Sequence, residues 1–188
     1  MKNKFKNTEK GFALPLALLL LVVMTIMGTT LVTISSNEHT ANTDKDQGQQ
    51  AFYAAESGIS VAKKYMVDNT SIITGSSQTN LDGDLKFCKA SFFPNLRTSN
   101  GFHFDKKSLN EVITASGAEA TRLSKFSFEY FIAYSPDVNG NNSSAKKKSG
   151  TNNTLYTIYS CGCNESKDKC SAQSNIIVPL EAVVTLIN

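Results

Sequence analysis

The sequence predicts an α+β fold in which a long N-terminal α-helix, transmembrane in its N-terminal half, packs on the antiparallel β-sheet of a globular head. Three observations support this fold class. An uncharged apolar segment fills residues 12–34, an apolar stripe with helical spacing follows at 50–68, and the remainder, 69–188, combines turn residues with strand-like alternation. The chain therefore divides into a leader at 1–11, a helix at 12–68 and a β-rich extracytoplasmic head.

The first eleven residues have the composition of a basic leader. They carry four lysines and one glutamate, whereas the whole chain carries 19 Lys+Arg and 16 Asp+Glu, a net charge of +3. Without the leader the charges balance, so the basicity belongs to the leader and no nucleic-acid partner is expected. Lysines beside a membrane span stay in the cytoplasm, which predicts a cytoplasmic N-terminus and an external head.

The apolar segment is long enough to cross a bilayer. Residues 12–34 contain no Asp, Glu, Lys or Arg. At about 1.5 Å per residue the helix spans about 35 Å, more than the roughly 30 Å of the hydrocarbon core. A secretory signal has a shorter apolar region, roughly 7–15 residues, which is discarded. We expect a retained span; an uncleaved signal or a plain single-pass anchor is the alternative.

The second half of the helix changes from polar to amphipathic. Residues 37–50 are almost entirely polar and predict an exposed stalk or a melted stretch. Apolar residues then recur at spacings of three and four, which places them on one helical face: Phe52, Ala55, Ile59, Ala62 and Met66. Small residues flank this stripe and permit close approach of a sheet: Ala51, Ala54, Ser57 and Gly58.

Three strands are predicted clearly in the head, at 126–134, 155–160 and 176–187, from alternation and from β-branched and aromatic content. Pro179 indicates that the last of them is an edge strand or carries a bulge. The hydrophilic residues 137–154 are expected to form a long hairpin connection. Between 69 and 120 the pattern is weaker, and we expect short strands at 87–93 and 112–115.

All four cysteines lie in the predicted head: Cys88, Cys161, Cys163 and Cys170. Disulfides persist in oxidising compartments, which agrees with an external head. Four cysteines allow three connectivities, and the sequence leaves all three open. A zinc site that includes His103 is the rival interpretation, but the chain lacks the usual pairs of Cys-x2–4-Cys units.

Other chemistry is sparse, so we expect no enzyme activity, no cofactor and no metal site. Neither a Gly-x-Ser-x-Gly context nor a glycine-rich phosphate loop is present. The segment 137–141 begins like a calcium loop, but its sixth and twelfth positions hold Asn142 and Lys148, and a turn is the better interpretation. Glu56 and Glu181 are the carboxylates expected to be partly buried, in structural hydrogen bonds or ion pairs.

Two blocks of sequence resemble a known family. Lys10-Gly11-Phe12 before a long apolar helix resembles the class III signal of type IV pilins and pseudopilins. With Gly28 and the QQAFYAAESGISVA block, residues 10–65 are similar to the PilX family of minor pilins, as are residues 155–188 at the other end. The resemblance implies a type IV pilin-like fold. It also implies that a prepilin peptidase cleaves between Gly11 and Phe12 and that Phe12 is methylated.

One position departs from the common pilin pattern. Most pilins carry a glutamate four residues beyond the methylated phenylalanine, whereas this chain has Leu16 there. In the family, that glutamate is thought to neutralise the N-terminal ammonium of the preceding subunit, since an unpaired charge is costly in hydrocarbon. A subunit without it suits the first position, so the resemblance implies a place in the tip or priming complex.

The resemblance also implies partners and a location. The partners are other minor and major pilins through the N-terminal helix, the inner-membrane assembly machinery and prepilin peptidase, with a tip adhesin as a further candidate. The location is the bacterial inner membrane and then the assembled pilus. Two alternatives are a GspK-type minor pseudopilin of type II secretion, a group that is usually longer, and a single-pass membrane-anchored periplasmic binding protein or enzyme.

Overall fold

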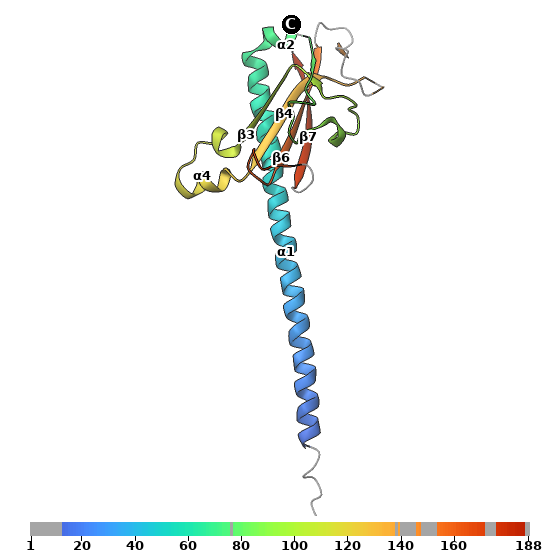
Figure 1. Ribbon diagram of the computed structural model, residues 1–188, viewed down its shortest axis with the longest axis vertical. Helices are drawn as coiled ribbons and strands as arrows, with labels where there is room; N and C mark the ends of the chain where they lie inside the picture. Colours follow the sequence, from blue (N-terminus) through green and yellow to red (C-terminus); the bar gives the residue numbers. More distant parts are fainter. Residues whose placement is uncertain are drawn as a thin grey trace, which may run out of the picture. The chain divides into compact units, whose positions relative to one another are not determined.

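The computed structural model describes residues 13–75, 77–137, 139, 146–147, 154–171 and 176–186. The predicted α+β class is confirmed: a long helix packs on an antiparallel sheet (Figure 1). The chain divides into two compact units, Met1–Lys45 and Asp46–Asn188, and helix α1 contributes to both. The elements in chain order are α1 (Ala13–Asp68), α2 (Thr70–Gly75), β1 (Thr79–Asn80), the 3-10 helix η1 (Ala90–Phe92), β2 (Asn100–Gly101), β3 (His103–Ser108), α3 (Leu109–Val112), α4 (Gly117–Leu123), β4 (Ser127–Tyr134), β5 (Lys146–Lys147), β6 (Thr154–Cys163) and β7 (Ile177–Leu186).

Helix α1 is unbroken through its polar middle. Residues 37–50 are helical, so the exposed-stalk interpretation holds for this stretch and the melted one is wrong. Threonine side chains there bond within the helix, since the Thr40 and Thr43 hydroxyls donate to the carbonyls of Ser36 and His39 at 3.1 and 2.9 Å. A polar surface therefore does not prevent helix formation here.

The main sheet is antiparallel, and the three strands predicted clearly are confirmed as β4, β6 and β7. β4 lies between β3 and β6, and β7 pairs with the other side of β6 along its whole length. The short β5 pairs with β6 beyond the end of β4. Pro179 lies in β7, which pairs with no strand other than β6 among the described residues, so its expected edge position is also confirmed.

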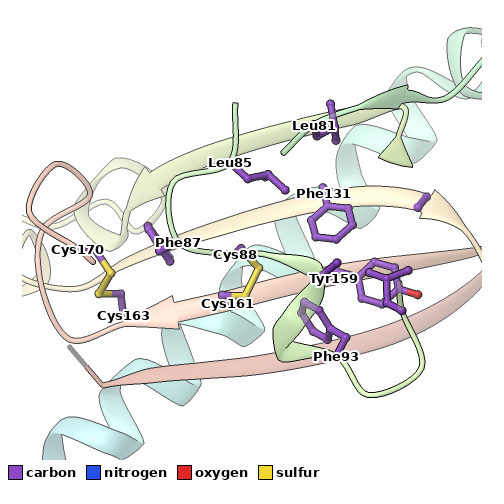
Figure 2. Packing of buried hydrophobic residues seen from close by; sticks show 13 residues of the cluster. Leu81, Leu85, Phe87, Cys88, Phe93, Phe131, Tyr159, Cys161, Cys163 and Cys170 are labelled. Carbon is purple, nitrogen blue, oxygen red and sulfur yellow. A yellow bond between two sulfur atoms is a disulfide. The ribbon is translucent and has the colours of Figure 1, made fainter. Parts of the chain in front are cut away.

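Both faces of the sheet are covered. On one face α1 contributes Ala54, Ala62 and Met66 to a core with alternate residues of β4 and β6. On the other face the segment 81–99 crosses β4 and β6 and supplies its own apolar side chains, as Figure 2 shows. Phe93 packs edge-on against Tyr159, with ring centroids 4.8 Å apart. The central strands β4 and β6 are consequently buried on both sides.

The two weaker strand predictions are wrong. Residues 87–93 form a loop that contains η1. Their apolar side chains pack on the face of the sheet away from α1, and the N–H groups of Phe87 and Cys88 bind the Glu129 carboxylate instead of a neighbouring strand. In the range 112–115, Val112 is the last residue of the short helix α3, and residues 113–115 follow it without forming a strand. The sequence-based interpretation also missed β3, whose sequence HFDKKS is polar because the strand is a half-exposed sheet edge.

Candidate assembly surface and the core that supports it

The first half of α1 presents an apolar surface on every side. All side chains from 14 to 34 are exposed within the chain, and none of them is charged. The large apolar side chains exposed in this stretch are Leu14, Leu16, Leu18, Leu19, Leu20, Leu21, Val22, Val23, Met24, Ile26, Met27, Leu31, Val32 and Ile34. A surface of this size is costly to leave in water, so it requires hydrocarbon or other apolar helices as its environment.

The few polar side chains of this segment are satisfied inside the helix. Each of four threonine hydroxyls donates to a backbone carbonyl three or four residues earlier, at 2.7 to 2.9 Å: Thr25 to Val22, Thr29 to Ile26, Thr30 to Met27 and Thr33 to Thr29. In hydrocarbon a hydroxyl without a partner is expensive, and internal bonds of this kind remove that cost. The segment is therefore compatible with lipid despite its threonines.

Among the described residues, α1 is the helix long and apolar enough to cross a membrane, and its most apolar window is 0% buried. Signal sequences near an N-terminus meet the same criteria of length and composition. The structure thus shows that α1 has the capacity to span a bilayer.

Of the residues that the pilin resemblance singled out at the N-terminus, Leu16 is described and Gly11 and Phe12 lie outside the described residues. Leu16 is 52% exposed on the apolar helix. Cleavage between Gly11 and Phe12 and methylation of Phe12 stay predictions. The same holds for most of the predicted connection 137–154, although the Asn139 amide donates to the Asp137 carboxylate at 2.8 Å, as in an Asx turn.

The second half of α1 contacts the sheet with almost no space between the two backbones. A Cβ built on Gly162 of β6 would lie 1.8 Å from the Ala51 carbonyl oxygen and 2.6 Å from the Ala55 nitrogen. The Ser160 hydroxyl donates to the Ala55 carbonyl at 2.8 Å. A Cβ on Gly58 would lie 2.3 Å from the same hydroxyl oxygen. The small residues of α1 therefore serve close packing, as the sequence suggested.

This contact joins the two blocks that carry the family resemblance. The AFYAAESG block supplies the helix side of the contact, and the SCGC segment of β6 supplies the sheet side. Ala51, Ala54 and Ala55 are 0% exposed, which confirms that this face of the helix belongs to the core. The blocks are far apart in sequence and depend on one another in the fold.

The opposite face of the sheet is organised by a buried carboxylate. Glu129 of β4 is 0% exposed. Its oxygens accept the backbone N–H groups of Lys86 at 2.9 and 3.0 Å, Phe87 at 2.8 Å and Cys88 at 2.7 Å. Successive amides that converge on a carboxylate neutralise the cost of burying it. We call this arrangement the Glu129 clamp.

Two disulfides secure the same face. Cys88 in the segment 81–99 is bonded to Cys161 of β6, and Cys163 is bonded to Cys170, seven residues further on. Within the described residues no cysteine is free and no His, Cys, Asp and Glu group could hold a metal, so the zinc interpretation is wrong for these cysteines. In the chain-entropy description the longer loop contributes about 4 kcal/mol and the shorter about 2 kcal/mol.

The prediction of the buried carboxylates was wrong. Glu56 and Glu181 are both exposed. Glu56 lies on the side of α1 away from the sheet, and the cluster built by the segment 81–99 reaches β7 at Ile177 without extending to Glu181. Glu129 is the buried one, and no burial was predicted for it from the sequence. The signal in the sequence was Phe131, an aromatic residue in the same phase of β4, which indicates that this face is covered too.

A small polar groove lies between the C-terminal end of α1 and β3. Tyr65 stacks on His103 with ring centroids 3.7 Å apart, and Lys107 pairs with Asp105 at 2.9 Å. Burial lowers the pKa of His103, and Asp105 opposes this effect. Burial also raises the pKa of Tyr130 at the base of the groove. These groups pair with one another, which is typical of a structural network.

One buried hydroxyl has no hydrogen-bond partner in the part of the chain that the structure describes. Tyr159 is 0% exposed, and its hydroxyl makes no hydrogen bond to the described residues. The neighbouring Thr157 hydroxyl pairs instead with that of Ser135 at 2.9 Å. Burial raises the pKa of Tyr159 to about 12, so the hydroxyl stays protonated at neutral pH.

No protein-family model, curated protein or solved structure matches this chain. The resemblance to pilins therefore stays a prediction from the sequence.

Proposed function

We propose that this protein is a minor pilin of the type IV pilus that acts in the initiation of pilus assembly and occupies the filament tip. The observation that carries the proposal is the surface of α1 from 14 to 34, which is apolar on every side and belongs to the same unbroken helix that packs on the head. An assembling pilin provides two successive environments for such a surface, the inner membrane and then the bundle of neighbouring pilin helices.

The tip position is supported by Leu16. No acidic residue occurs between 14 and 34, so this chain offers no partner within the membrane to the N-terminal ammonium of a preceding subunit. An unpaired ammonium in hydrocarbon is costly, which disfavours placing this chain after another subunit. The first subunit of a filament has no predecessor and avoids this cost.

The disulfides support the proposed topology, with the N-terminus in the cytoplasm and the head in the periplasm. Both bridges lie in the unit Asp46–Asn188, and disulfides are rare in the cytosol. The proposed partners are other minor and major pilins, the assembly machinery of the inner membrane, prepilin peptidase and a tip adhesin. In this proposal the protein has no enzyme activity and uses no cofactor.

The mature N-terminus is the first test. Intact-mass measurement and N-terminal sequencing of the protein purified from membranes should find a chain that starts at methylated Phe12. A chain that retains Met1 would indicate a plain membrane anchor and contradict the proposal. A soluble exported chain that starts after 34 would contradict it too, because the apolar surface would then be discarded.

Gene deletion and a charge at position 16 test the role at the tip. Deletion should abolish surface pili; loss of protein secretion with normal pili would indicate a type II pseudopilin instead. Leu16→Glu should increase the amount of this protein along sheared filaments, because the variant can pair with a predecessor. Leu18→Glu is the matched control, since it adds the same charge two residues away. Equal behaviour of the two variants would contradict the role assigned to Leu16.

A further inference from the structure

The arrangement of the cysteines poses a choice of partner for Cys88. Cys161 and Cys163 are two residues apart on β6, and both belong to the core on the face that the segment 81–99 covers. They are separated by only about 7 Å along the strand. A short shift of the segment 86–88 along the sheet would bring Cys88 to Cys163 in place of Cys161.

The Glu129 clamp acts at the position where this choice is made. Glu129 is the direct cross-strand partner of Cys161 in the register of β4 and β6. Its carboxylate accepts the backbone N–H of Cys88 itself at 2.7 Å, together with the N–H groups of Phe87 and Lys86. The bonded Cα atoms of Cys88 and Cys161 are 5.3 Å apart. One carboxylate thus fixes the backbone of Cys88 beside Cys161.

On β4, as the structure describes it, no equivalent acceptor faces Cys163. Its partner on β4 is Ser127, whose hydroxyl already donates to the Glu165 carbonyl at 2.7 Å. A single hydroxyl oxygen cannot accept the several amides that the two carboxylate oxygens of Glu129 bind. On the described β4, Glu129 is the only acidic residue, so the clamp exists in one register alone.

We propose that Glu129 is a positioning residue that selects Cys161 over Cys163 as the disulfide partner of Cys88. The oxidant is a small-molecule or protein disulfide. It first forms a mixed disulfide with Cys161; the Cys88 thiolate then attacks the Cys161 sulfur, the S–S bond of the bridge forms, and the remaining oxidant thiolate leaves. Two thiols of the protein are oxidised and one disulfide of the oxidant is reduced to two thiols. Cys163 is left for Cys170.

A competition between two thiols for Cys88 tests this proposal. The full-length chain carrying Cys170→Ser is reduced, unfolded in urea with detergent, and returned to native conditions with oxidised and reduced glutathione. Free thiols are then alkylated. Tandem mass spectrometry assigns the bridge, because only Gly162 separates the competing cysteines. With Glu129 present we expect the bridge to Cys161 to exceed that to Cys163 by about tenfold or more. With Glu129→Gln the ratio should fall toward one, and in concentrated urea both chains should give the same ratio.

Two further variants separate positioning from general loss of stability. Glu181→Gln removes an exposed carboxylate on the same face of the sheet. Gly58→Ala loosens the opposite face, where its Cβ would lie 2.3 Å from the Ser160 hydroxyl oxygen. Both should keep the preference for Cys161. The proposal is overturned by an unchanged ratio in Glu129→Gln, or by an equal fall in Gly58→Ala or Glu181→Gln. The ratio is measured on all alkylated products, so it is obtained whether or not a variant completes folding.

Discussion

Replacement of Gly162 by alanine tests the contact between α1 and the sheet most directly. The added Cβ would lie 1.8 Å from the Ala51 carbonyl oxygen and 2.6 Å from the Ala55 nitrogen. Both atoms belong to the helix backbone, so no side-chain rotation relieves the overlap. Ordinary contacts begin near 3.4 Å, and the helix must therefore retreat from β6 by roughly 1.5 Å locally.

The cost follows from two contributions. Overpacking a close-packed core costs about 1–3 kcal/mol. Retreat of the helix also lengthens the hydrogen bond from the Ser160 hydroxyl to the Ala55 carbonyl, now 2.8 Å, whose loss costs about 1 kcal/mol. We expect Gly162→Ala to lower the free energy of unfolding by about 3 kcal/mol, a large fraction of the 5–15 kcal/mol typical of a domain.

The assay is urea unfolding of the full chain in detergent, followed by tyrosine fluorescence because the chain has no tryptophan. Gly48→Ala is the matched control, since Gly48 lies in α1 with no atom within 4 Å of its built Cβ. That change should raise the free energy of unfolding by up to about 1 kcal/mol through helix propensity. A loss below 1 kcal/mol for Gly162→Ala would refute the close backbone contact.

Three other outcomes can be measured on the same preparation. Because burial lowers the pKa of His103 below 6.5, the unfolded state binds more protons than the folded state around that pH, and the free energy of unfolding should fall as the pH drops below about 6.5. His103→Phe can still stack on Tyr65 and should reduce this pH dependence of stability between pH 7.5 and 5.5. Tyr159→Phe removes a buried hydroxyl without a partner among the described residues, so the free energy of unfolding should stay the same or rise by up to about 1 kcal/mol. Serine at both Cys88 and Cys161 should cost about 4 kcal/mol, against about 2 kcal/mol for the same change at the shorter bridge; equal losses would contradict the loop-length argument.

The elements predicted well are those in which apolar residues recur with a clear helical or strand spacing. The apolar segment 12–34, the helical stripe and the strand β4 each satisfy a local pattern, and each has the expected secondary structure over the described residues. Within the stripe, Ala55, Ala62 and Met66 are buried as predicted, whereas the prediction for Phe52 is wrong, because its side chain is 43% exposed. Strand β3 and the segment 81–99 lack such a pattern, because one is a polar sheet edge and the other is held by contacts made elsewhere.

The Glu129 clamp illustrates why part of the site could not be predicted. Its partners are backbone N–H groups 41 to 43 residues away. Every residue except proline has such a group, so the residue types do not indicate which ones bind Glu129. The disulfide pairing is hidden in the same way, since Cys161 and Cys163 are chemically equivalent in the sequence. Only the register of β4 against β6 distinguishes them.

Strand β6 connects these features physically. Ser160 and Gly162 face α1, while Cys161 and Cys163 face the segment 81–99, because successive residues of a strand point to opposite faces. A displacement of α1 along the sheet would therefore act on the strand that bears both disulfides. Within the described residues, α1 reaches the 81–99 layer through β6 by backbone contact on one face and covalent bonds on the other. Within the unit Asp46–Asn188, a force on α1 is therefore passed by backbone contact to β6 and by a covalent bond to the segment 81–99.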